Sequence, residues 1–167
     1  LSIQNDEQQF HLSIYFLISL LAIPWGFYSG TLVDRYPRKR IMLLESLGGF
    51  CLLLIAAFLI HNQIGQAKII VAAVFAITFL IYNIHYPNLY AFVQEITPKE
   101  NYQKANALLE TVGQVSTVVA GAAAAFLLKG TQNGKANLFG FEAKVPFDIS
   151  AWSIEQIFLL DGISYLV

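Results

Sequence analysis

Charged residues are scarce in this sequence, and cysteine is almost absent. Asp, Glu, Lys and Arg together make up 13% of the 167 residues, whereas soluble domains carry about 25%. The single cysteine, Cys51, excludes an intramolecular disulfide and a cysteine-based metal centre. The few cations form no broad basic face beside the aromatic residues, so the composition gives no support to nucleic-acid binding.

Sequence signatures of enzyme active sites are missing as well. The chain has no nucleophile elbow and no HExxH pair, and the glycines and lysine of residues 130–135 lack the spacing of a phosphate-binding loop. His11, His61 and His85 are too scattered to form a metal site. We therefore expect a protein that is not an enzyme, with no catalytic residue, no cofactor and no bound metal. Residues 130–135 are expected to form a flexible outer loop.

Long apolar runs are what the sequence has in abundance. Hydrophobic residues make up 56% of the chain, and the mean hydropathy is +0.57. The runs are long enough to cross a hydrocarbon layer of about 30 Å, which predicts an all-α membrane protein in a lipid bilayer. The predicted spans are residues 10–33, 41–60, 68–93, 104–128 and, cut short by the end of the sequence, 154–167.

The two ends of the sequence differ from those of a complete membrane protein. The first nine residues are polar, and they lack the cationic region and cleavage site of a signal peptide. There is no initiator methionine, and the last residues lie in an apolar run. We expect residues 1–167 to be one incomplete helix bundle that begins in a loop.

Lysine and arginine divide unequally between the two sides of the predicted bundle. The side with segments 34–40 and 95–103 holds six of the ten cations, four of them in the short first segment. Cytoplasmic loops of membrane proteins are enriched in Lys and Arg. We predict that 34–40 and 95–103 face the cytoplasm.

The segment 30–40 joins two predicted spans and holds most of this charge. Gly30 allows another helix to approach closely, and Asp34 lies one turn further along the same helix face. A carboxylate beside four cations stays ionised and can pair with them or with a helix N-terminus. On charge alone, an ordinary positively charged loop with one compensating acid explains the segment equally well.

The order of residues in this segment resembles the loop motif between the second and third helices of major facilitator superfamily transporters, G-x-L-x-D-R-x-G-R-K-R. Pro37 stands where the family most often has glycine. The resemblance implies that the spans are helices two to six of a twelve-helix fold. The chain would then be part of the N-terminal six-helix bundle, facing a C-terminal bundle of the same protein. The matching positions are Gly30, Leu32, Asp34, Arg35, Arg38, Lys39 and Arg40.

Two further segments are similar to the enterobactin- and macrolide-exporter-like branch of that superfamily. Residues 95–107 share its P-x-E-x-x-x-x-A-N spacing, and residues 158–165 resemble its sixth helix. The resemblance implies secondary active export of a small amphipathic compound, a drug or a siderophore, by alternating access and coupled to protons. It also implies that the membrane is a bacterial inner membrane. An alternative of another class is the bundle of a lipid-handling transporter fused to an acyltransferase-type enzyme.

The resemblance also implies roles for the motif residues. In the family, this motif latches the two halves together on the cytoplasmic side. Asp34 would be the latch acid, Arg35 and Arg38 its network, and Gly30 the contact that lets the opposite half approach. One family signature is not met: many antiporters carry a Gly-Pro pair on helix five, and span 104–128 has no proline. Its small residues favour helix packing instead.

Aromatic and polar residues in the third span predict a substrate cavity. Tyr82 and Tyr86 lie one turn apart with Asn83 beside them, and Gln114 comes from the next span. Pro87 removes the hydrogen bond to the carbonyl of Asn83, which leaves an acceptor exposed. Such a lining suits an amphipathic substrate. An aromatic belt at the membrane interface explains the tyrosines equally well.

Ionisable residues inside membrane spans are candidates for proton binding or ion pairing. The two glutamates lie within two turns of the predicted cytoplasmic ends and can instead pair with the basic loop. The histidine can titrate near neutral pH, although one histidine on an apolar face is more often a packing residue. The four candidates are Glu45, His85, Glu110 and Asp161.

Overall fold

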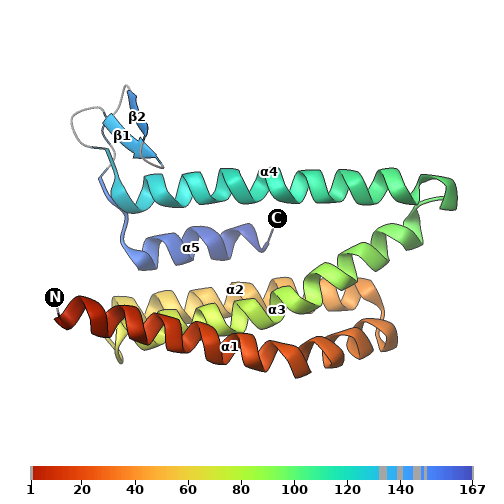
Figure 1. Ribbon diagram of the computed structural model, residues 1–167, viewed down its shortest axis with the longest axis horizontal. Coiled ribbons are helices and arrows are strands. Elements are labelled where there is room, and N and C mark those ends of the chain that lie inside the picture. The colour runs from red at the N-terminus through yellow and green to blue at the C-terminus, as the bar shows by residue number, and fades with distance from the viewer. Residues whose placement is uncertain (1, 132–134, 139–140, 145–147, 149, 167) are drawn as a thin grey trace.

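The computed structural model describes residues 2–131, 135–138, 141–144, 148 and 150–166. Within this part of the chain, long helices dominate, and one two-stranded hairpin precedes the last helix (Figure 1). In chain order the elements are α1 (Ser2–Arg35), α2 (Arg38–His61), α3 (Ala67–Ile96), a 3₁₀ turn (Lys99–Asn101), α4 (Tyr102–Lys129), β1 (Lys135–Leu138), β2 (Phe141–Lys144) and α5 (Ile154–Ser164).

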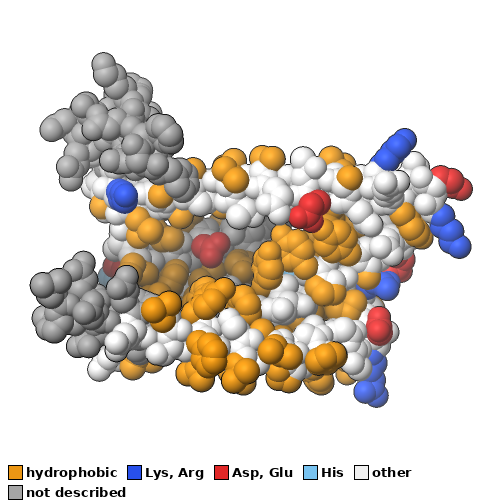
Figure 2. Space-filling model, in the orientation of Figure 1, with side chains coloured by type: hydrophobic (Ala, Val, Ile, Leu, Met, Phe, Trp, Pro, Cys, Tyr) orange, Lys and Arg blue, Asp and Glu red, His pale blue; other side chains and the backbone are white. Residues whose placement is uncertain are grey.

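Four of these helices are long and apolar enough to cross a membrane. The membrane-length segments are Leu12–Arg35, Arg38–His61, Ala67–Ile96 and Lys99–Lys129. Large apolar side chains point outward along them, with Phe27 81% and Leu44 70% exposed. Figure 2 shows apolar side chains along the flanks and most of the charged ones at one end. Lipid tails solvate such a surface, so the prediction of an all-α membrane protein is confirmed.

The helices pack around α2, which lies against both α3 and α5, while α1 lies against α3. The buried core is small, and its contiguous cluster consists of Leu53, Ala56 and Val74. Glycine allows α5 to come close, because a Cβ on Gly49 would overlap the ring of Tyr165. Close approach at small residues is the usual means of helix association in lipid. α4 makes few contacts with α3 and α5 and lies beyond α5 in Figure 1.

The connection between α1 and α2 is only two residues long. α1 ends at Arg35 and α2 begins at Arg38, which leaves Tyr36 and Pro37 between them. The Pro37 carbonyl accepts hydrogen bonds from the backbone of Arg40, at 2.9 Å, and of Ile41, at 3.3 Å. This turn and the one between α3 and α4 lie at the same end of the molecule, as the sequence predicts (Figure 1).

Two expectations from the sequence are wrong. The first residues were expected to form a loop, yet α1 begins at Ser2, because this segment is rich in Gln and Glu, which are good helix formers. The polar residues 129–153 after the fourth predicted span have the composition of a loop, yet they contain the antiparallel pair β1–β2, with Lys135 opposite Lys144. Strands close in sequence can pair across a short connection without any apolar pattern. Residues 132–134 of the expected flexible loop lie outside the described residues.

Candidate functional site

The charged motif lies where α1 turns into α2. Gly30, Asp34 and Arg35 lie in the last turns of α1, while Arg38 opens α2. A Cβ placed on Gly30 would meet no atom within 4 Å, so the close approach expected of this glycine is not made to any described residue. Lys39 and Arg40 follow in the first turn of α2, and their side chains are exposed.

Arg38 joins α2 to the end of α3. Its guanidinium donates to Glu95 Oε2 at 2.8 Å, with the two side chains 30% and 60% exposed. The backbone carbonyl of Arg38 accepts a hydrogen bond of 3.1 Å from Asn88 Nδ2, and Asn88 is fully buried. A buried amide that spans two helices fixes their register, because leaving its partner unpaired is costly. Glu95 was not among the residues predicted for the motif.

Asp34 faces a small cavity beside this pair. The cavity measures about 260 Å³ and is lined by Asp34, Tyr36, Arg38, Phe92 and Glu95 among others. Within the described ranges the carboxylate of Asp34 makes no hydrogen bond or ion pair, although Arg38 lines the same cavity. The acid is therefore exposed and available to a further partner.

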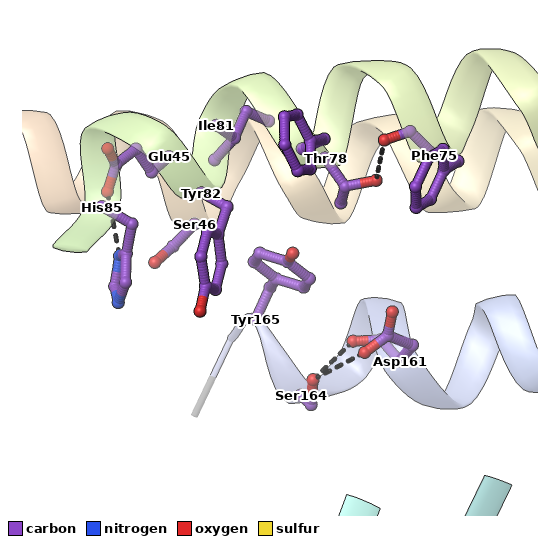
Figure 3. Close-up of a pocket in the computed structure, with 11 residues that line it drawn as sticks. Glu45, Ser46, Phe75, Thr78, Ile81, Tyr82, His85, Asp161, Ser164 and Tyr165 are labelled. Carbon is purple, nitrogen blue, oxygen red and sulfur yellow. Dashed lines mark hydrogen bonds and ion pairs between the residues drawn. The ribbon is translucent and has the colours of Figure 1, made fainter. Parts of the chain in front are cut away.

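A larger cavity opens between α2, α3 and α5 (Figure 3). Its volume is about 720 Å³, which is within the range of about 300–1,000 Å³ typical of small-molecule pockets. Apolar and aromatic side chains make most of its wall, with a few polar groups among them. The lining residues are Glu45, Ser46, Phe75, Thr78, Phe79, Ile81, Tyr82, His85, Asp161, Ser164 and Tyr165.

Three of the four predicted ionisable candidates line this cavity. Glu45 of α2 and His85 of α3 are paired, with 3.1 Å between Glu45 Oε2 and His85 Nδ1. Asp161 of α5 lies across the cavity, where the Ser164 hydroxyl donates to its backbone carbonyl at 2.6 Å and lies 3.4 Å from Oδ1. Figure 3 shows the side chains of Asp161 and Tyr165 directed from α5 toward α3.

The fourth candidate, Glu110, is separate from this cavity. Its carboxylate accepts hydrogen bonds from the Tyr90 hydroxyl and, at 3.0 Å, from Gln114 Nε2. These contacts link α4 to α3 without any cation. Neither glutamate therefore pairs with the basic loop, as they could have done from their position in the sequence.

Of the residues predicted to form the substrate cavity, only Tyr82 lines the large one. The ring of Tyr82 lies against that of Tyr86, with centroids 4.5 Å apart. Asn83 uses its amide within its own helix and donates to the Phe79 carbonyl at 2.8 Å. Gln114 is engaged by Glu110. The four residues are thus not brought together as one lining.

The structure adds residues that sequence reasoning missed. Phe75 and Phe79 lie one turn apart and continue the aromatic row of Tyr82 toward the other end of α3. Their four-residue spacing is a readable signal, because residues i and i+4 share a helix face. Tyr165 carries no such signal, since its place in the wall follows from the packing of α5 against Gly49.

Comparison with known proteins identifies the family. The model of the Major Facilitator Superfamily matches residues 1–143, which include the charged motif and all four membrane-length helices. No curated protein and no solved structure matches the chain. The resemblance inferred from residues 30–40 is confirmed at the level of the superfamily, and with it the reading of these helices as part of its N-terminal bundle. The chain belongs to the major facilitator superfamily, whose members are multi-pass membrane proteins that act as secondary transporters rather than enzymes.

Proposed function

We propose that this protein exports a small amphipathic compound by alternating access, in the manner of the enterobactin- and macrolide-exporter-like branch. The observation that carries the proposal is the cavity between α2, α3 and α5, which combines an aromatic wall with two carboxylates. A largely apolar wall with a few polar groups is what small-molecule sites have in common.

The chemistry of the wall favours one kind of compound. Glu45 and Asp161 both face the cavity, and Phe75, Phe79 and Tyr82 offer aromatic faces. Carboxylates and aromatic faces attract cations and repel anions. A neutral or cationic drug-like compound is therefore a better substrate than an anionic siderophore.

Asp34 is the proposed latch between the two halves of the transporter. It is exposed at the end of α1, beside a small cavity, and has no partner within the described residues. A helix N-terminus or a cation of the C-terminal half can therefore bind it in one state and release it in the other. The proposal places residues 34–40 and 95–103 on the cytoplasmic side of a bacterial inner membrane.

The direct test of export uses cells that express the complete gene product. Labelled ethidium, a macrolide and a catecholate siderophore are each added, and accumulation is compared with a vector control, with and without a protonophore. We expect lower accumulation of the cationic or neutral compounds, and the protonophore should abolish the difference. Accumulation equal to the vector control for every compound would contradict the proposal.

The latch is tested by Asp34→Asn. The variant should reach the membrane in normal amounts and export about tenfold less, a loss within the usual range of coupling between sites. Glu100→Gln is the matched control, because Glu100 is an exposed acid at the same end without a partner within the described ranges. Equal export by Asp34→Asn and wild type removes the latch assignment.

A further inference from the structure

Glu45 is nearly enclosed, and only one of its two carboxylate oxygens is satisfied. Its side chain is 10% exposed. Oε2 lies 3.1 Å from His85 Nδ1, whereas Oε1 is buried and has no hydrogen-bond partner in the described part of the chain. A buried carboxylate needs a compensating charge or a proton, because burial removes its hydration.

One group beside Glu45 can provide either the compensating charge or the proton. The titratable groups that line the cavity with Glu45 are Tyr82 and His85 of α3 and Asp161 and Tyr165 of α5. The Tyr86 ring lies against His85, with centroids 6.0 Å apart. Among the described residues, the wall of this cavity contains no lysine or arginine. His85 is thus the one lining side chain that can carry positive charge, and histidine ordinarily titrates near neutral pH.

The other two acids among the four ionisable candidates lack this arrangement. Glu110 has both oxygens hydrogen-bonded, by Tyr90 and Gln114, and touches no base. Asp161 is more exposed to the cavity, and its described partner is the Ser164 hydroxyl. Of these three described acids, only Glu45 combines burial, an unsatisfied oxygen and contact with a group that gains and loses a proton.

We propose that the Glu45–His85 pair is the proton-carrying site of the transport cycle, an inference that rests on the export function proposed above. With the proton on His85, the buried carboxylate is neutralised by the imidazolium. When the proton leaves to the cavity, Glu45 is left charged without a cation, and a cationic substrate in the cavity takes over that role. One proton is thus exchanged for one positive charge of substrate. His85 is 41% exposed, so the proton has a path to the cavity.

The first experiment needs no substrate. Infrared difference spectra of the purified complete gene product, recorded across a pH series, report protonation of carboxyl and imidazole groups. Glu45→Gln and His85→Gln should each remove the same titrating component, because the two groups share one proton. Glu110→Gln and Asp161→Asn are the matched controls and should keep it. A component that survives in both Glu45→Gln and His85→Gln overturns the proposal.

The second experiment separates coupling from a structural role. Proteoliposomes are loaded with ethidium, and two rates are measured: accumulation driven by an imposed pH gradient, and exchange of labelled for unlabelled ethidium without a gradient. In His85→Gln, accumulation should fall at least about tenfold more than exchange, because the proton site is lost while Glu45 still faces the substrate. Glu45→Gln should lower both rates, because it also removes the carboxylate that meets the substrate's charge. Equal loss of both rates in His85→Gln, or full accumulation by it, contradicts the proposal.

The two proposals fail in different ways. If the wild-type protein moves no ethidium, a macrolide or any other tested compound, the exporter function fails, and the infrared titration alone decides the proton site. If wild type accumulates ethidium but the pair does not titrate, the exporter stands and this inference fails. Should Glu45→Gln not fold, His85→Gln provides the same test from the other side of the pair.

Discussion

Two acid–base pairs join α2 to α3, and they differ in solvent exposure and in the kind of base. Arg38 and Glu95 meet at 2.8 Å at the charged end of the bundle, where both side chains reach solvent. Glu45 and His85 meet at 3.1 Å farther along, where the acid is nearly enclosed. The seven residues from Arg38 to Glu45 correspond to about two helical turns.

The difference teaches which contact can change during a transport cycle. Arginine stays protonated at any physiological pH, so the end pair is a permanent attraction whose strength solvent reduces. Histidine can lose its proton, so the inner pair is conditional, and its loss is felt strongly because the acid is buried. One helix pair therefore carries a constant contact at its end and, under our proposal, a switchable one inside.

The largest effect should come from making the inner pair permanent. His85→Arg fixes a positive charge beside Glu45, so a proton can no longer be exchanged there. We expect gradient-driven ethidium accumulation to fall roughly 100-fold and its pH dependence to flatten, as measured in proteoliposomes between pH 5.5 and 8.5. His61→Arg, the same change at an exposed position outside the cavity, is the control. A wild-type pH profile in His85→Arg would show that the inner pair is not conditional.

A smaller effect should come from loosening the support of the end pair. Asn88→Ala removes the buried amide that donates to the Arg38 carbonyl and leaves a void at a position with 0% exposure. We expect the free energy of unfolding to fall by about 2 kcal/mol, measured by denaturant titration in mixed micelles. Asn83→Ala should cost less, because that amide bonds only within its own helix. Equal losses would mean that the bond between the helices adds nothing.

The smallest effect should come from the end pair itself. Glu95→Gln keeps the shape of the side chain and removes its charge, and exposed ion pairs contribute at most about 1 kcal/mol. The loss should shrink further at high salt, because screening weakens attraction between exposed charges. Glu100→Gln, in the same turn region, should change stability less. A cost above that of Asn88→Ala would reverse the contrast between exposed and buried contacts.

Much of the fold is readable from the sequence because lipid-facing helices are long apolar runs. The second span was predicted at 41–60 and the helix covers Arg38–His61; the third was predicted at 68–93 and the helix covers Ala67–Ile96. Most residues between the predicted and the observed boundaries are polar or charged, so hydropathy places the boundaries a few residues inside the helix ends. The polar start of α1 shows the same effect over a longer segment.

The site was harder to predict, because its contacts join positions distant in sequence. Arg38 and Glu95 are separated by 57 residues, and the pairing depends on how α2 and α3 are aligned. The meeting of Glu45 with Asp161 in one cavity depends on α5, which reaches α2 only because Gly49 leaves room for Tyr165. The four ionisable candidates could be named from the sequence. Which of them line the same cavity depends on the close packing of α5 against α2 at Gly49.

The short turn at Tyr36 and Pro37 has a mechanical consequence for the whole bundle. The connection consists of Tyr36 and Pro37, and the proline ring fixes its own φ angle. Such a short connection prevents one helix from sliding along the other. α1 and α2 each lie against α3 rather than against each other, so their relative motion is confined to a hinge at this turn. A 24-residue helix is about 36 Å long, so a tilt of about 10° at the pivot carries its far end roughly 6 Å sideways. A small change in angle at the charged end therefore becomes a displacement of several ångströms at the other end of the helix.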